Sequence, residues 1–262
     1  MASASPNGFR VQSVVSDLFN TLVNPDVYRP EGFMRARRIA EILEVTEVDD
    51  FVGWWREMEP QRHVNGSKKV VQYADEYLVN HYGRRCTPEQ LAQVSQIWGL
   101  MHDQALLKPQ AEVLASLGML REMGVKLGLL SNIDEREAAL WPRSPLFPLF
   151  DVVCMSIDTG YSKPSREAYS LILSRLGVDA RFSIYMGDGN HDELGGARRA
   201  GFGFVVFMKG FLSNGSSGNS ETIKRRESQA DATITNLAEL VALVERLQSR
   251  AEVRVKPKAV GD

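Results

Sequence analysis

The chain has 262 residues, of which 44% are hydrophobic and 24% charged, values that are typical of a globular protein with a sizeable core. A formal net charge of −2 offers no basic excess for nucleic acid or an anionic membrane, and no apolar run approaches the ~20 residues of a membrane helix. Two cysteines, Cys86 and Cys154, are too few for a disulfide framework or a zinc site, and the first residues lack the pattern of a secretory signal, so we expect a cytoplasmic protein.

The first predicted element is a strand within Arg10 to Val23, with the sequence RVQSVVSDLFNTLV. A β-branched run that ends on Asp17 is typical of a buried parallel strand, and Thr21 follows four residues later. Open α/β sheets bind ligands at the carboxyl ends of their strands. We therefore expect Asp17 to lie at a ligand site.

The next region, residues 24–108, has helical spacing and no convincing strand. Apolar residues recur at helical intervals in EGFMRARRIAEIL, FVGWWREM, KKVVQYADEYLVNHYG and TPEQLAQVSQIWGLMHDQAL. The last segment opens on Thr87 and Pro88, a favourable helix start. This pattern predicts an inserted all-helical domain.

From Pro109 onward, predicted helices and strands alternate as in a doubly wound domain. The predicted strands are VKLGLL, DVVCMSI, RFSIYM, FGFVVFM and a short ATI. We expect residues 213–231 to form a polar loop, because they are rich in Gly and Ser. The fold class is then α/β, with a doubly wound parallel-sheet, Rossmann-like core over residues 9–23 and 109–249. Residues 1–8 and 250–262 are expected to be disordered termini.

Four polar groups follow apolar strands or precede a helix: Asp17, Ser131, Lys163 and Asp188. Each one alone is a weak signal, because caps, turns and solvated loops use the same residue types. Asp188 lies between two glycines and precedes Asp192 and Glu193, a carboxylate pattern that suits a hard cation. The same pattern also occurs at ordinary acidic helix starts.

Taken together, these segments resemble the four motifs of the haloacid dehalogenase (HAD) superfamily. The matching stretches are SDLFNT, LLSN, SKPSREAY and MGDGNHDELGGARRAGF, and the resemblance extends from about Val11 to Leu247. It implies that residues 24–108 are a C1-type helical cap domain. It also implies a hydrolase with a small phosphorylated molecule as substrate, and a monomer or homodimer.

The resemblance assigns a role to each motif residue. Asp17 would be the nucleophile, while Thr21 and Ser131 would hold phosphoryl oxygens and Lys163 would neutralise charge. Mg²⁺ would be held by the carboxylates of Asp17, Asp188 and Glu193 and by the backbone carbonyl of Phe19. The side chains of Phe19, Asn20 and Asn132 would contact the substrate.

Phe19 departs from the phosphatase pattern, which usually has an aspartate two residues after the nucleophile. Such a residue gives general acid–base catalysis of about 10²–10⁴-fold, and a phenyl ring cannot supply it. In a first interpretation, the substrate has a leaving group that needs no proton, or a cap residue supplies the acid. The candidates in the cap are His63, Asn65, Ser67 and Lys68. His63 and Lys68 would otherwise be ordinary solvated surface residues.

Two other interpretations are compatible with Phe19. A 2-haloacid dehalogenase has an aromatic residue at this position but lacks the aspartate corresponding to Asp188, and a phosphonatase would need a cap lysine such as Lys68 or Lys69. The third interpretation is an impaired metal- or phosphate-binding module. We predict a Mg²⁺-dependent hydrolase of a small phosphorylated metabolite, because Asp188 has a clear role only beside a cation. Trp54 and Trp55 are candidates to line its pocket.

Overall fold

The computed structural model describes residues 10–63, 68–212 and 220–255. Its centre is a six-stranded sheet in the order β3-β2-β1-β4-β5-β6, in which every pair is parallel. The strands are β1 (Ser13–Ser16), β2 (Lys126–Ser131), β3 (Val152–Met155), β4 (Ser183–Gly187), β5 (Phe204–Met208) and β6 (Ala232–Ile234). The predicted doubly wound parallel sheet and all of its strands are confirmed.

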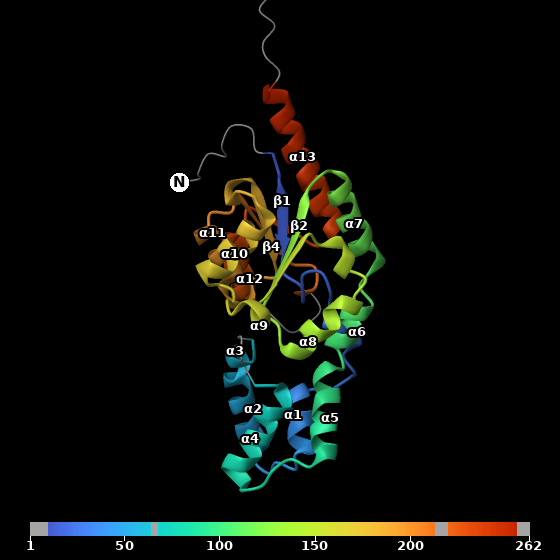
Figure 1. Cartoon of the computed structure of the whole chain (residues 1–262), viewed down its shortest axis with the longest axis vertical. Helices are drawn as coiled ribbons and strands as arrows, with labels where there is room; N and C mark the ends of the chain where they lie inside the picture. Colours follow the sequence, from blue (N-terminus) through green and yellow to red (C-terminus); the bar gives the residue numbers. More distant parts are fainter. Residues whose placement is uncertain (1–9, 64–67, 213–219, 256–262) are drawn as a thin grey trace, which may run out of the picture.

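Helices cover both faces of this sheet (Figure 1). On one face lie α7 (Ala111–Glu122) and α13 (Leu237–Val255), and their apolar residues form one core cluster with Val14 and Leu127. On the other face lie α10 (Arg166–Leu176), α11 (Glu193–Arg199) and α12 (Ser220–Gln229), which pack around Tyr169, Tyr185 and Phe207. Burial on both faces explains why the strands are continuous apolar runs.

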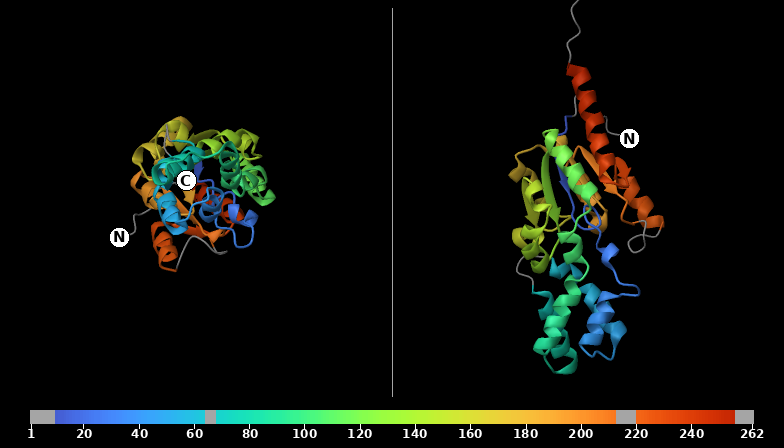
Figure 2. Two further views of the ribbon diagram at one scale, coloured as in Figure 1. Left: turned by 90° about the horizontal axis from the view of Figure 1, so that it is seen from below. Right: turned by 90° about the vertical axis from the view of Figure 1, so that its right-hand side faces the viewer.

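The inserted region forms a helical cap beyond the carboxyl ends of the strands (Figure 2). Its elements are η1 (Pro25–Tyr28), α1 (Arg35–Ile42), α2 (Val48–Glu57), α3 (Glu59–Arg62), α4 (Val70–Tyr82), α5 (Pro88–Gly99) and α6 (His102–Leu107). The cap has its own apolar cluster, which includes Phe51, Trp55 and Tyr77. The predicted helix start at Thr87 is confirmed, because its hydroxyl accepts a hydrogen bond from the backbone N–H of Gln90 at 3.2 Å.

The last predicted cap segment is two helices, α5 and α6, rather than one continuous helix. Gly99 ends α5 where a side chain would meet Arg136, since a Cβ built there lies 2.3 Å from the Arg136 Nε. After the break, Ala105 and Leu106 of α6 pack in the cluster of the core domain. The helix α6 is therefore packed on the core, although it follows directly from the cap.

The remaining core segments complete the chain. They are α8 (Glu135–Leu140), η2 (Trp141–Arg143), η3 (Phe147–Leu149), α9 (Ser156–Thr159), η4 (Ala180–Phe182) and η5 (Asn190–Asp192). No helix within residues 10–63, 68–212 and 220–255 has the length together with the hydropathy that crossing a membrane requires.

The prediction of a loop over residues 213–231 is wrong for its second part, which forms α12. The helix is mostly polar, but Ile223 packs against the core and Arg226 is 4% exposed. Tertiary packing, rather than helical periodicity, stabilises this segment. At the end of the chain, α13 continues past Arg250 to Val255, and residues 1–8 and 256–262 lie outside the described residues.

We expect Gly128→Ala to destabilise the core, because β2 and α10 meet there without room for a side chain. A Cβ at Gly128 would lie 2.9 Å from Leu176 Cδ1 and 3.0 Å from Ile172 Cδ1. Overpacking of this kind costs about 1–3 kcal/mol, which urea unfolding can measure. The matched control is Gly118→Ala in α7, where a Cβ meets nothing within 4 Å. That variant should be neutral or slightly more stable, and equal losses in both variants would contradict the packing argument.

Candidate functional site

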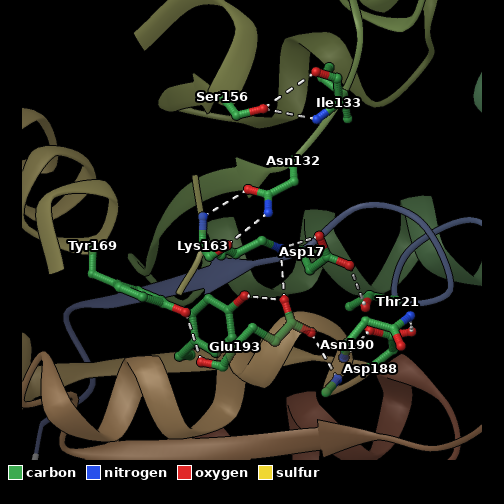
Figure 3. Close-up of polar contacts among 12 residues, drawn as sticks. Asp17, Thr21, Asn132, Ile133, Ser156, Lys163, Tyr169, Asp188, Asn190 and Glu193 are labelled. Carbon is green, nitrogen blue, oxygen red and sulfur yellow. Dashed lines mark hydrogen bonds and ion pairs between the residues drawn. The ribbon is translucent and has the colours of Figure 1, made fainter. Parts of the chain in front are cut away.

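Three of the four predicted polar groups, Asp17, Lys163 and Asp188, lie close together at the carboxyl edge of the sheet (Figure 3), and the fourth, Ser131, lines the same cavity as these three. Asp17 follows β1, Ser131 ends β2 and Asp188 follows β4, while Lys163 lies in the loop before α10. These strands are neighbours in the sheet, so their ends are brought close together by the parallel pairing. All four side chains are buried, with 8% exposure at Asp17 and less at the others.

Lys163 links Asp17, which follows β1, to Glu193 at the start of α11. Its Nζ donates to Asp17 Oδ1 and, at 2.7 Å, to Glu193 Oε2. Burial disfavours the ammonium, but the two carboxylates more than offset this effect and raise the pKa of Lys163. The Asn132 side chain fixes the loop by accepting from the Lys163 backbone N–H at 2.8 Å and donating to its carbonyl at 3.0 Å. Asn132 therefore positions Lys163 in this structure.

Glu193 is held by a complete set of donors. Besides Lys163, the Tyr185 hydroxyl donates to Oε2 at 2.6 Å and the Gly189 backbone N–H donates to Oε1 at 2.8 Å. Although burial opposes ionisation, the paired Lys163 lowers the pKa of Glu193 below its usual value. Gly187 is required here, because a Cβ at that position would lie 2.2 Å from Glu193 Oε1.

Among the described residues, the hydrogen-bond donors to Asp188 are both neutral groups of Asn190. The backbone N–H of Asn190 donates to Oδ1 at 2.9 Å, and the Asn190 side chain donates to Oδ2 at 2.6 Å. Arg226 of α12 does not bond to Asp188 itself but donates to Asn190 Oδ1 at 2.6 Å. Burial, with smaller contributions from Glu193 and Asp17, raises the pKa of Asp188 well above its usual value.

The residues present fit a divalent cation. Oxygens of Asp17, Asp188 and Glu193 all lie within 4.8 Å of one another, and all three residues are buried. These three carboxylates face one ammonium, so the ionised cluster carries two uncompensated negative charges. Burial above all, opposed by Lys163, raises the pKa of Asp17 to about 6. Carboxylate oxygens around surplus negative charge are the donor set that Mg²⁺ prefers.

Thr21 and Asn20 are positioned by a tight turn after β1. The Thr21 hydroxyl donates to Asp17 Oδ2 at 3.1 Å. The turn is closed by the Asn20 backbone N–H, which donates to the Val23 carbonyl at 2.7 Å, and Asn20 has a left-handed φ of 58°. Asn is among the residues that tolerate this conformation. Thr21 is fully buried, whereas Asn20 lines the cavity beside Asp17.

The Phe19 side chain stacks on His102 of α6, with ring centroids 4.4 Å apart and an interplanar angle of 22°. His102 Nδ1 in turn pairs with Glu137 Oε1 of α8. Burial lowers the pKa of His102 to about 3 and raises that of Glu137 to about 7. In neutral solution His102 is thus uncharged, and Glu137 is about half ionised. The aromatic residue of the first motif is therefore part of a buried contact between α6 and α8.

Further polar contacts connect the cap to α8. The Trp98 indole N–H of α5 donates to Asp134, the N-cap of α8, and Arg136 Nη1 donates to Ser95 Oγ at 3.0 Å. Arg136 also pairs with Asp103. Burial raises the pKa of Asp134 to about 6. These residues were not predicted as functional, because they come from three separate segments without a common motif.

A cavity of about 270 Å³ lies over the cluster of carboxylates. Its lining includes Asp17, Ser131, Lys163 and Asp188 from the core and Glu59 and His63 from the cap. His63, a predicted substrate-binding residue, is thus brought to the site. Lys68 is not part of this lining, because it lies at the start of α4, where its Nζ pairs with Glu76 at 2.6 Å. The prediction of Lys68 as a substrate ligand is not supported, while Asn65 and Ser67 lie outside the described residues.

A larger cavity, of about 460 Å³, lies within the cap. It shares Asn20, Arg35, Glu59 and His102 with the smaller one, so the two cavities adjoin. Trp55 and Trp98 give it an aromatic wall. Of the two tryptophans predicted to line a pocket, Trp55 lines this one, whereas Trp54 packs on Tyr77 beside a different hollow.

Comparison with known proteins identifies relatives for most of the chain. The family model of haloacid dehalogenase-like hydrolases matches residues 11–201. A glyceraldehyde 3-phosphate phosphatase from Methanocaldococcus jannaschii is 30% identical over 147 residues, which cover 55% of this chain and 60% of that protein. A ribulose-1,5-bisphosphate 5-phosphatase from Halopiger xanaduensis is 28% identical over 173 residues, which cover 66% and 71% respectively.

Solved structures share the whole architecture. A putative β-phosphoglucomutase from Thermotoga maritima superposes with a TM-score of 0.61 and 20% identity, covering 90% of this chain and 99% of that one. At this level of identity the likeness concerns the fold, namely a parallel-sheet core with a helical cap. Because the family model matches well over half of its length, the chain belongs to the haloacid dehalogenase-like hydrolases.

Proposed function

We propose that this protein is a Mg²⁺-dependent phosphatase of small phosphorylated metabolites that uses Asp17 as its nucleophile. The observation that carries the proposal is the buried group formed by Asp17, Lys163, Asp188 and Glu193, with its excess of negative charge. The two relatives, a glyceraldehyde 3-phosphate phosphatase and a ribulose-1,5-bisphosphate 5-phosphatase, support it.

The chain's own residues can carry out two successive displacements. In the first, an Asp17 oxygen attacks phosphorus, the bond from phosphorus to the leaving oxygen breaks, and an aspartyl-phosphate forms. In the second, water attacks that phosphorus, which regenerates Asp17 and releases inorganic phosphate. Lys163 keeps Asp17 ionised and oriented, Thr21 holds Asp17 Oδ2, and Ser131, which lines the cavity, donates to a phosphoryl oxygen. When bound, Mg²⁺ would be held by Asp17, Asp188, Glu193 and the Phe19 carbonyl, and would offset the negative charge of the phosphoryl group.

Phe19 limits which phosphates can react quickly. Neither it nor its neighbour His102 can protonate a leaving alcohol readily, since partial burial lowers the pKa of His102 to about 3. Acyl phosphates and other substrates with acidic leaving groups need no such proton. For ordinary esters, His63 of the cap is a candidate proton donor, because it lines the cavity over the carboxylates.

The alternative chemistries have less support. Phe19 resembles the aromatic residue of 2-haloacid dehalogenases, but Asp188 and Glu193 remain together beside Asp17. A phosphonatase-type mechanism requires a cap lysine, and the described lining of the site cavity has a lysine only at position 163. The same intact cluster argues against a decayed binding module.

The proposal predicts phosphate release that depends on Mg²⁺ and on Asp17. We expect wild-type protein to release inorganic phosphate from a panel that includes acetyl phosphate and triose phosphates, and to lose this activity with EDTA. Asp17→Asn should reduce turnover at least 10³-fold, because an amide is a poor nucleophile. Parallel assays of halide and phosphonate cleavage complete the measurement.

The control is Asp158→Asn, at the surface of α9, which should keep wild-type turnover. Halide release without Mg²⁺ would overturn the proposal in favour of a dehalogenase. Calorimetric Mg²⁺ binding without turnover of any compound would instead indicate a binding module.

A second prediction concerns Phe19→Asp. If the missing acid limits the rate, the variant should hydrolyse glycerol 3-phosphate at least tenfold faster than wild type, a modest part of the range for general acid–base catalysis. The matched control is Phe19→Asn, because an asparagine side chain has the same shape as an aspartate side chain but cannot protonate the leaving oxygen. An equal gain in both variants, or no gain in a folded Phe19→Asp protein that still binds Mg²⁺, would contradict the explanation.

A further inference from the structure

Arg35 is the first residue of α1 and lines both adjoining cavities. Its guanidinium carbon lies 4.6 Å from the centroid of the Trp98 ring. Its Nε is buried and has no hydrogen-bond partner. Within the described residues, no hydrogen bond or ion pair to the Arg35 guanidinium is present. This is unusual, because buried polar atoms such as this Nε normally have a hydrogen-bond partner.

The other arginines of the first cap segment differ from Arg35. Arg29 pairs with Asp26 at 2.5 Å, Arg37 with Asp49 at 2.6 Å and Arg38 with Glu41 at 2.6 Å. These three guanidinium groups are at least 39% exposed as side chains. Arg35 is therefore the one of these four arginines whose guanidinium has no carboxylate partner in the described part of the chain, and it is only half-buried.

The acids whose charges act on Arg35, namely Glu137, Asp134 and Asp26, have other partners. Glu137 pairs with His102 and accepts from the Asp134 backbone N–H at 3.2 Å, and Asp134 accepts from Trp98 and from its own helix. Burial also raises the pKa of Glu137 to about 7, so this carboxyl is at most half ionised in neutral solution. Asp26 is paired with Arg29. The acids around Arg35 therefore leave the positive charge of its guanidinium without an ion-pair partner in the described residues.

We propose that Arg35 binds a carboxylate of the substrate, so that the enzyme acts on phosphorylated small acids with the phosphoryl group at Asp17. This inference rests on the proposed function and names its substrate class. A carboxylate is preferred to a second phosphate because its two coplanar oxygens match the Nε–Nη edge of a guanidinium, and Trp98 fixes the plane of that group. The volumes of the two cavities, about 270 and 460 Å³, suit a small metabolite.

Three compounds with one carbon skeleton test the proposal. They are 3-phosphoglycerate, glyceraldehyde 3-phosphate and glycerol 3-phosphate, which end in a carboxylate, an aldehyde and an alcohol. We expect the wild-type kcat/KM for the acid to exceed that for the alcohol at least tenfold. Arg35→Gln should bring this ratio close to one. Arg35→Lys should retain part of the preference for the acid, because an ammonium keeps the positive charge but lacks the paired, coplanar N–H donors of a guanidinium. Arg37→Gln, on the same helix but exposed, should leave the ratio unchanged.

Equilibrium binding to the Asp17→Asn protein with Mg²⁺ separates this inference from the proposed phosphatase activity. Calorimetry should show the acid binding at least tenfold more tightly than the alcohol, and the double variant with Arg35→Gln should lose that preference. Preferential binding without turnover of any compound would leave the Arg35 site standing and reject the phosphatase.

Three outcomes would overturn the Arg35 site. These are equal losses on all three compounds in Arg35→Gln, no preference for the acid in either assay, or tighter binding of propane-1,3-diol bisphosphate than of the acid.

Discussion

The bridge from Lys163 to Asp17 and Glu193 is the interaction on which the rest of the site depends. It joins the end of β1 to the start of α11 through the loop before α10, so three segments must be in place at once. Removing one partner of a buried ion pair costs about 3–5 kcal/mol, since the other charge is left uncompensated. Here the loss of Lys163 would leave three carboxylates close together. The sheet, the Asn132 clamp and the glycine at position 187 all support this bridge.

Phe19 connects this chemical centre to a second buried cluster. Its ring stacks on His102, which is paired with Glu137, and the same helix α8 accepts Trp98 of the cap at its N-cap, Asp134. An aspartate at position 19 would replace that stacked ring with a short charged side chain. The aromatic residue therefore has a packing role in addition to its effect on leaving-group protonation. The loss of the general acid and the fixing of α6 against α8 are two consequences of one residue.

Much of the core site could be predicted, because in a parallel sheet a residue that follows an apolar strand has a defined position. Asp17, Ser131 and Asp188 were found in this way. Tyr185, Asn190 and Arg226 were missed, since their roles come from hydrogen bonds across the fold rather than from a pattern. The helix α12 was missed because it is polar and depends on packing. Lys68 was assigned to the site from its place in the chain, but it pairs with Glu76.

Chemistry and recognition are divided between the two parts of the molecule. The groups that react lie at strand ends, which the sheet holds rigidly, and such placement favours catalysis that depends on geometry. Arg35 and Trp55, by contrast, lie on cap helices, whose side chains can change without disturbing the sheet. The two cavities adjoin at Asn20 and His102, which line both of them, and Phe19 stacks on His102 there. A substrate that spans both cavities would contact the turn after Asp17 with the central part of its carbon chain. Binding of one end in the cap would then orient the phosphoryl group at the other end for reaction in the core.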